Sequence, residues 1–266
     1  MSFANNVFEI TRPLRLRRSD VVGPSVSVII PVVADNEALT RLLNRLYSME
    51  GPPDEIVIVD GGASSSCRSL ARQFSCIYVS ARRGRGHQLH AGALRASGDI
   101  LWFLHADAVP PVNAVALIRA QHTDGSAGGY FGFRFTGTSV WYKAALARLI
   151  NLRARFGIPY GDQGLFAAKA AYDAAGGFAD VPLFEEVQLV RALRRQGSFA
   201  CMPAEIGVSP RRWERDGWVR RTLGNRLLAL GYAIGISPHR LARRYQPLRN
   251  DDAKRSTTPP CDNDTC

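Results

Sequence analysis

Three acidic residues, Asp60, Asp107 and Glu186, stand at positions where an α/β protein binds ligands. Asp60 and Asp107 come at or just after the carboxyl ends of apolar runs, and Glu186 comes where a helix is expected to begin. In an open α/β sheet, ligands bind in the crevice outside the carboxyl ends of the strands. Carboxylates there are costly unless a cation, a hydrogen-bond donor or a substrate pairs with them. The pattern leads to the hypothesis of a nucleotide and divalent-metal site with a catalytic base beside it.

The elements that must position these residues follow from alternating apolar runs and helical spacings. Strand-like runs alternate with helix-like segments through four cycles, which argues for right-handed βαβ units and a parallel sheet. After Pro110 the pattern changes to a mixed region without a linker, so we expect it to extend the same sheet. The predicted strands are 25–30, 55–59, 76–80, 100–104 and 128–135, with a short strand after a turn at 161–166. The predicted helices are 36–47, 64–74, 87–96, 140–156 and 185–196.

The predicted fold class is therefore α/β, with a mostly parallel sheet flanked by helices and with further helices towards the C-terminus. The predicted divisions are an extension over 1–22, a main domain over 23–215, helices over 216–248 and a disordered tail over 249–266. Residues 218–236 are basic first and apolar later. Two interpretations fit this helix equally, an interfacial helix on an anionic membrane and a helix packed on the main domain.

Composition limits the partners and the compartment. The net charge of +11 favours an anionic partner such as nucleotide phosphates, a membrane surface or nucleic acid, although a solvated basic surface would give the same charge. Five cysteines without metal-type spacing indicate reduced thiols in a cytoplasmic protein. No signal peptide is expected, and no apolar run approaches the ~20 residues that span a bilayer. The expected location is the cytoplasm, with peripheral attachment to the inner face of the membrane as a compatible variant.

Two segments are candidates for nucleotide binding through loops that follow strands. Pro31 begins a loop that ends in Asn36-Glu37 and enters a helix, where free N–H groups can face an anion. Asp60-Gly61-Gly62 ends the second strand, where the carboxylate can accept a hydrogen bond from a base imide. A plain helix cap at Asn36 and a common Asp-Gly turn explain the same residues without a ligand.

Three further segments could supply phosphate, metal and proton-transfer groups. Arg85 lies in a glycine-rich arginine loop, and its guanidinium can match diphosphate oxygens. Asp107 at the mouth of a buried strand can hold Mg²⁺ or Mn²⁺, although it could equally cap the helix after Pro110. Glu185 and Glu186 can open a helix simply because acidic groups suit its dipole. Two successive carboxylates after Pro-Leu-Phe make that explanation weaker.

Taken together, these segments resemble the family 2 glycosyltransferases with the GT-A fold, over about residues 25–215. The resemblance is closest to short, single-domain bacterial members with His-Ala-Asp and Gly-Asp-Gln-Gly motifs. The matching segments occur in the family's order. They are Ile30-Pro31 with Asn36-Glu37, Val59-Asp60-Gly61-Gly62, Gly84-Arg85 with Ala91-Gly92, His105-Ala106-Asp107, Gly161-Asp162-Gln163-Gly164, Glu185-Glu186 and Arg211-Arg212-Trp213.

The resemblance implies an inverting transfer of a sugar from a nucleoside-diphosphate sugar to an acceptor hydroxyl or carboxyl group. It implies Glu186 as the general base and Asp107 as the ligand of Mg²⁺ or Mn²⁺. The nucleotide would be held by Pro31, Glu37, Asp60 and Arg85. The acceptor would be bound by Asp162, Gln163, Glu185, Arg212 and Trp213. A lipid-linked acceptor and a soluble acceptor are both compatible, and no nucleic acid partner is expected.

Three positions depart from the family's pattern. His105 replaces the first Asp of the metal motif, and Glu186 replaces the usual Asp base while keeping its carboxylate. His90 stands where these members often have Asn, which leaves the sugar preference open. Two alternatives of other kinds are a nucleotidyltransferase on a related fold and a non-catalytic basic module that binds membranes or nucleic acid. The first would need a glycine-rich loop directly after the first strand, where this chain has Pro31 and two valines.

Overall fold

The computed structural model describes residues 23–123 and 125–245. The predictions for 1–22 and 249–266, and for the last residues of 216–248, lie outside the described residues. The chain divides into two compact units, Met1–Pro210 and Arg211–Cys266. The boundary therefore lies earlier than the predicted one after residue 215, and the segment 211–215 belongs to the second unit.

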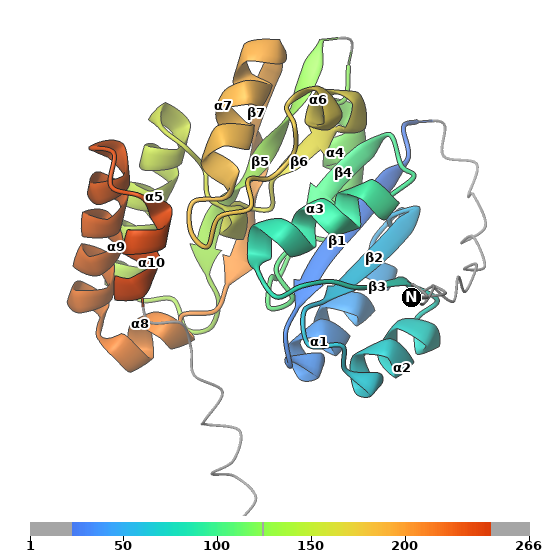
Figure 1. Cartoon of the computed structure of the whole chain (residues 1–266), viewed down its shortest axis with the longest axis horizontal. Helices are drawn as coiled ribbons and strands as arrows, with labels where there is room; N and C mark the ends of the chain where they lie inside the picture. The colour runs from blue at the N-terminus through green and yellow to red at the C-terminus, as the bar shows by residue number, and fades with distance from the viewer. Residues whose placement is uncertain (1–22, 124, 246–266) are drawn as a thin grey trace, which may run out of the picture. The chain divides into compact units, whose positions relative to one another are not determined.

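The first unit is built on a seven-stranded sheet with the order β3-β2-β1-β4-β6-β5-β7 (Figure 1). The parallel pairs are β1 with β2, β1 with β4, β2 with β3 and β5 with β7, whereas β6 is antiparallel to both β4 and β5. The predicted α/β class with a mostly parallel sheet is thus confirmed. The strands are β1 Val26–Val32, β2 Glu55–Asp60, β3 Ile77–Ser80, β4 Ile100–Phe103, β5 Ser126–Phe135, β6 Phe166–Ala168 and β7 Ser198–Val208.

Helices cover both faces of this sheet (Figure 1). Successive side chains of a strand point to opposite faces, so Val28 and Ile30 join one apolar cluster with α1, α2 and α4. Ile29 between them joins a second cluster with α3, α6 and α7. The helices of this unit are α1 Asn36–Tyr47, α2 Ser65–Gln73, α3 Arg85–Arg95, α4 Ala114–Gln121, α5 Trp141–Phe156, α6 Lys169–Ala174 and α7 Glu186–Gln196, with a 3₁₀ turn η1 over Gly161–Gln163.

Several elements differ from the sequence-based expectation. The first strand continues through Pro31, which pairs in register with Val59. The pairing of β1 with β4 ends at Ile29, and the carbonyl of Ile29 faces β4. Strand geometry repeats every two residues, so the backbone of Pro31 also faces the β4 side, beyond the last residue that pairs with β4. The lack of an N–H group in proline therefore removes no hydrogen bond from the sheet. The strand β7 was not predicted. It lies at the edge of the sheet and contains polar residues and Pro203, so its sequence lacks the continuous apolar run of a buried strand.

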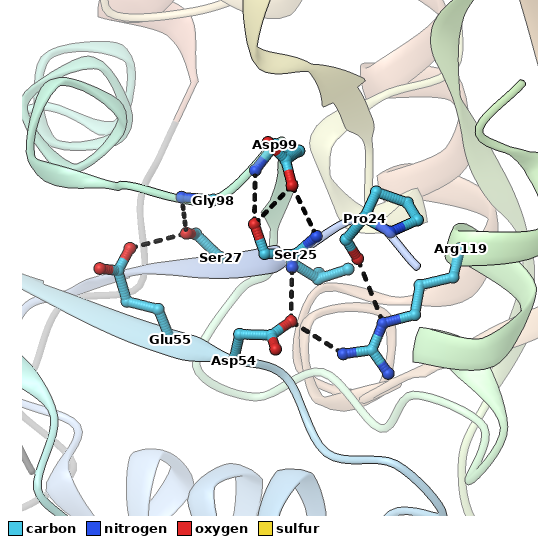
Figure 2. A network of polar contacts seen from close by, with 9 residues as sticks. Pro24, Ser25, Ser27, Asp54, Glu55, Gly98, Asp99 and Arg119 are labelled. Carbon is cyan, nitrogen blue, oxygen red and sulfur yellow. Dashed lines mark hydrogen bonds and ion pairs between the residues drawn. The ribbon is translucent and has the colours of Figure 1, made fainter. Parts of the chain in front are cut away.

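A polar network joins the amino-terminal ends of β1, β2 and β4, as Figure 2 shows. The Ser27 hydroxyl donates to a Glu55 carboxylate oxygen at 2.6 Å and accepts from the Gly98 amide at 2.9 Å. Asp99 accepts from both the amide and the hydroxyl of Ser25. Since Ser27 is fully buried, its satisfied hydroxyl stabilises this end of the sheet.

The second unit contains α8 Arg211–Asp216, α9 Trp218–Ala233 and α10 Pro238–Arg244. Arg221 donates to Asp216 at 3.3 Å and to the Tyr245 hydroxyl at 2.8 Å. Gly231 allows close packing, because a Cβ there would lie 3.0 Å from Leu241 Cδ2. Among the described residues, no helix is long and apolar enough to span a membrane.

We predict that Ser27→Ala lowers the free energy of unfolding by about 1–3 kcal/mol, because the buried Gly98 amide loses its acceptor. Denaturant unfolding measures the change. Ser48→Ala, which removes an exposed hydroxyl bonded to Arg45, is the matched control and should cost less. An equal cost for both variants would contradict a special role for the buried network.

Candidate functional site

Gln88 ties together the carboxyl ends of the two strands that begin the site. Its amide nitrogen donates to the Val32 carbonyl at 3.0 Å and to the Val59 carbonyl at 2.8 Å. The side chain is almost completely buried. A Cβ on Gly61 would lie 3.0 Å from the Gln88 amide group, so the loop after β2 passes directly over it. Sequence analysis missed Gln88, because a polar residue within a helix carries no motif signal.

Asp60, predicted to bind the nucleotide, shapes the loop after β2. It is fully buried, and its carboxylate accepts from the Gly62 and Ser64 amides, each at 2.7 Å, and from the Tyr78 hydroxyl at 3.1 Å. These bonds fix the turn that leads from β2 into α2. Direct recognition of a nucleotide base by Asp60 stays a prediction, whereas its structural effect on the loop is evident.

The loop after β1 differs from the sequence expectation in two details. Asp35, rather than Asn36, caps α1 by accepting from the Ala38 amide at 3.2 Å. Asn36 instead donates to Ser66 at 2.7 Å and so joins the start of α1 to the start of α2. Glu37 is exposed and paired with Arg41 on the same helix. The structure therefore places Glu37 on an exposed helix face, and Pro31 lies partly buried at the end of β1.

Arg85 lies at the start of α3 and meets the segment before α7. Its guanidinium is 3.3 Å from the carboxylate of Glu185, a residue 100 positions away in the chain. Close approach depends on Gly86, because a Cβ there would lie 2.3 Å from the Ala179 carbonyl oxygen and 3.0 Å from Glu185 Cβ. Arg82 and Asp180 form a second, exposed ion pair between the same two segments at 2.5 Å. The predicted phosphate-binding arginine and a predicted acceptor-binding glutamate thus belong to one site.

Glu186 is a buried carboxyl group whose pKa is strongly raised. It begins α7 and is buried beside the buried Glu185. Burial raises the pKa of Glu186 to about 8, and the neighbouring Glu185 and Asp162 charges also raise it. A backbone hydrogen bond and the Arg85 charge oppose the shift. A carboxyl group with a pKa near neutrality is suited to exchange protons with a substrate.

Tyr160 and Asp162 border this carboxyl pair from the turn that precedes β6. Burial raises the pKa of the Tyr160 hydroxyl, and the Glu186 and Asp162 charges add to the rise. The Arg153 guanidinium lies 3.8 Å from the centre of the Tyr160 ring and opposes it. The predicted acceptor residue Asp162 therefore shares an electrostatic environment with Glu186.

Gln163 and Gly164 hold the same turn in place. Gln163 is fully buried, and its amide group donates to the Phe131 carbonyl and accepts from the Tyr160 amide, both at 3.3 Å. Both amide atoms of Gln163 are used inside the fold, and its predicted contact with an acceptor stays a prediction. Gly164 has a φ of +55°, and a Cβ there would lie 2.1 Å from Ile206 Cδ1.

Strained backbone conformations occur in the loops after β1 and β2 and directly before α7. Among the described residues, the non-glycine residues with positive φ are Ala34, Ala63, Ser75 and Phe184. Ala34 follows β1, Ala63 follows β2, and Phe184 directly precedes the Glu185-Glu186 pair. Such conformations persist only where the surrounding structure enforces them, and they concentrate at functional sites.

The metal motif lies on the turn after β4. The Ala108 amide donates to the His105 carbonyl at 3.0 Å, and both His105 and Asp107 are partly buried. A Cβ on Gly161 would lie 3.2 Å from His105 Nε2, so this turn approaches η1. Within the described part of the chain, no group of three or more His, Cys, Asp or Glu side chains could hold a metal ion. A single carboxylate such as Asp107 could hold a hard divalent cation only together with water and phosphate oxygens, and its role as a metal ligand stays a prediction.

His90, Arg212 and Trp213 have partners other than the carboxyl groups described above. His90 contacts the Tyr172 hydroxyl at 3.0 Å and packs over Gly177. Arg212 and Trp213 belong to the second unit, where Arg212 donates to the Tyr245 hydroxyl at 3.2 Å and Trp213 packs against Trp218. Their predicted role in acceptor binding stays a prediction.

Comparison with known proteins gives the family and the fold. The family profile described as "Glycosyl transferase family 2" matches residues 27–179. The glycosyltransferase AglE of Haloferax volcanii is 34% identical over 96 residues, which are 33% of this chain and 32% of that protein. Undecaprenyl-phosphate 4-deoxy-4-formamido-L-arabinose transferase of Enterobacter sp. is 25% identical over 158 residues, 52% of this chain and 46% of that protein. The matched part thus spans less than half the length of these relatives.

Two solved structures share the fold. The Pyrobaculum calidifontis mannosyltransferase in complex with GDP-Man and Mn²⁺ superposes with a TM-score of 0.58 at 18% identity, covering 85% of this chain and 66% of that one. Glucosyl-3-phosphoglycerate synthase of Mycobacterium tuberculosis, in complex with Mn²⁺, UDP and glucosyl-3-phosphoglycerate, gives a TM-score of 0.50 at 19% identity, covering 70% and 71%. The predicted GT-A fold is confirmed, and the family match decides against the nucleotidyltransferase and the non-catalytic module.

The raised pKa of Glu186 gives a testable pH dependence of stability. The folded protein keeps a proton that the unfolded chain releases between pH 4.5 and about 8. The free energy of unfolding should therefore fall as pH rises through this window. Glu186→Gln removes this penalty. We expect the stability of the variant relative to wild type to grow across the window, by at most about 1.4 kcal/mol per unit of pKa difference.

Denaturant unfolding from about pH 5 to about pH 9 measures this difference. Glu50→Gln, which neutralises an exposed carboxyl group, controls for the loss of one charge. A stability difference between Glu186→Gln and wild type that stays constant across the window would contradict the raised pKa.

Proposed function

The chain belongs to glycosyl transferase family 2, and on that premise we propose that it transfers a sugar with inversion from a nucleoside-diphosphate sugar to an acceptor hydroxyl group. The observation that carries the proposal is the buried Glu185-Glu186 pair beside Arg85, in which burial raises the pKa of Glu186. With a pKa near neutrality, part of the Glu186 population is ionised at neutral pH, and this ionised form can accept a proton in the reaction and release it to solvent afterwards. An acceptor carboxylate would need no base, so Glu186 favours a hydroxyl over a carboxyl acceptor.

In the proposed reaction, Glu186 accepts the acceptor's hydroxyl proton while the oxygen attacks the anomeric carbon of the donor. The bond between that carbon and the diphosphate oxygen breaks from the opposite face, so the configuration inverts. Arg85 is 38% exposed at its side chain, so its guanidinium can bind diphosphate oxygens while it remains close to Glu185. Arg85 is in contact with Glu185, and Glu186 is the group that exchanges the proton in this proposal.

The divalent cation would be held by Asp107 together with the donor diphosphate. When bound, it would neutralise charge that develops on the leaving diphosphate. Solved structures with this fold contain Mn²⁺ with UDP or with GDP-Man, which supports Mn²⁺ or Mg²⁺ and a nucleoside-diphosphate donor here. Relatives that use undecaprenyl phosphate support a lipid-linked acceptor.

We expect Glu186→Gln to reduce turnover of the nucleotide sugar by about 10²- to 10⁴-fold, the usual contribution of a general base. Calorimetry should show unchanged binding of the nucleoside diphosphate. Glu185→Gln is the matched control. Helical side chains at successive positions diverge by about 100°, so only one of the two can face the anomeric carbon, and Glu185→Gln should mainly raise the acceptor KM. Near-normal turnover in Glu186→Gln would refute Glu186 as the base.

Metal binding should depend on Asp107 and on the nucleotide together. A single carboxylate holds Mg²⁺ or Mn²⁺ weakly, so we expect low affinity in the free protein and higher affinity once nucleoside diphosphate is added. Asp107→Asn should lose metal-dependent turnover, whereas His105→Ala should retain measurable turnover. Titration of Mn²⁺ followed by paramagnetic relaxation measures the affinity. The opposite ranking of the two variants would show that the metal assignment is misplaced.

Nucleotide affinity should depend on Arg85 and Asp60 for different reasons. Arg85→Gln removes a positive charge that faces the diphosphate, and Asp60→Asn weakens the bonds that fix the loop after β2. Both variants should bind UDP or GDP more weakly in calorimetry, by about tenfold for each loss of a charge-assisted hydrogen bond. Arg82→Gln, which changes the exposed pair with Asp180, is the control. Unchanged affinity in both test variants would remove these residues from the nucleotide site.

A further inference from the structure

Helix α9 turns its aliphatic face outwards. Its exposed apolar side chains recur at spacings that place them on one helix face, and they include Leu227 at 68% and Ile234 at 71% exposure. The opposite face carries Arg221, which is bonded to Asp216 and Tyr245. Gly231 lies at the side of the stripe and packs on Leu241. This arrangement is the reverse of an ordinary surface helix. The full stripe is Val219, Leu223, Leu227, Leu230 and Ile234.

Helix α5 of the first unit repeats this pattern at the same spacing. Its exposed face includes Trp141 at 82% and Phe156 at 80% exposure. An arginine stands seven residues after the first member of each stripe, Arg148 in α5 and Arg226 in α9, and both are exposed. The full α5 stripe is Trp141, Ala145, Leu149, Leu152 and Phe156. Two helices from different units thus each present an uncovered apolar stripe beside an arginine.

The charged residues within these helices have one sign. The helices α5, α9 and α10 contain no acidic residue. Their basic residues are Lys143, Arg148, Arg153 and Arg155 in α5, Arg220, Arg221 and Arg226 in α9, and Arg240, Arg243 and Arg244 in α10. By helical geometry, Arg220 and Arg226 lie on the two borders of the α9 stripe. Long arginine side chains can reach a charged headgroup while the aliphatic face enters the layer below.

We infer that α5 and α9 are each built to lie on the surface of an anionic lipid bilayer, with their apolar stripes in the headgroup–acyl boundary. An apolar face bordered by basic residues is the combination that such surfaces select. Trp141 and Tyr142 add aromatic groups of the type that settles at headgroup level. A second copy of the chain is a poorer occupant, because a symmetric contact would bring the same positive borders together. This inference does not depend on the reaction proposed above.

Sedimentation with lipid vesicles tests the inference on the full chain. We expect binding to vesicles of phosphatidylcholine mixed with phosphatidylglycerol, and little binding to phosphatidylcholine alone. Each basic residue near an anionic surface contributes about fivefold to the partition coefficient, so Arg220→Gln with Arg226→Gln should weaken binding roughly 30-fold. The pair Arg191→Gln with Arg195→Gln makes the same charge change at exposed positions of α7 and should weaken binding much less.

The apolar stripes are tested by separate variants. Leu227→Gln with Leu230→Gln in α9, and Leu149→Gln with Leu152→Gln in α5, should each weaken binding at least tenfold. Leu94→Gln, at an exposed leucine outside both helices, is the control. Equal binding by the variants and wild type, or no binding to anionic vesicles, would overturn the inference. A wild-type dimer that the α9 leucine variant converts to a monomer in light scattering would overturn it too, since the stripe would then cover a second copy.

Discussion

The contact between Arg85 and the Glu185-Glu186 pair is the interaction on which the site depends. Two successive carboxyl groups are buried at the start of α7, and burying like charges side by side is unfavourable unless a cation or a proton compensates. Arg85 provides the cation at 3.3 Å from Glu185. The second carboxyl group, Glu186, has its pKa raised to about 8, so its protonated and ionised forms interchange near neutral pH. The same physical constraint that threatens the fold therefore creates a base poised for proton transfer.

The rest of the first unit keeps this contact rigid. Gln88 connects the ends of β1 and β2 to the helix that begins with Arg85. The Asp60 carboxylate accepts hydrogen bonds from the loop between β2 and α2. Gly86 allows α3 to approach the segment before α7 closely. At the amino-terminal ends of the strands, Ser27 and Glu55 form a hydrogen bond within a buried polar network (Figure 2). Polar side chains thus stabilise the sheet at the amino-terminal ends of its strands, and at the carboxyl-terminal ends they form the proposed site.

The sequence was sufficient for the elements whose signals are local. Continuous apolar runs such as Ile56–Val59 predict buried parallel strands, and the helix bounds 36–47 agree with α1. The motif positions Arg85, Glu185 and Glu186 were also identified. The contact between Arg85 and Glu185 joins residues 100 positions apart, so no local pattern could reveal it. Gln88 and β7 escaped prediction because buried polar residues and an edge strand with Pro203 look unlike core elements. Glu37 and Gln163 were assigned to ligands, yet the structure turns one to an exposed helix face and the other into the fold.

The central claim is that burial beside Glu185 raises the pKa of Glu186 from its ordinary value to near neutrality, where its ionised form can accept the acceptor's proton. Carboxyl-carbon NMR titration of protein labelled at glutamate measures this directly, with Glu186→Gln used to assign the resonance. The account predicts a Glu186 titration midpoint near pH 8, and a higher midpoint after Arg85→Gln, because the compensating charge is lost. A midpoint near the ordinary value of 4.5 in the wild-type protein would contradict the account.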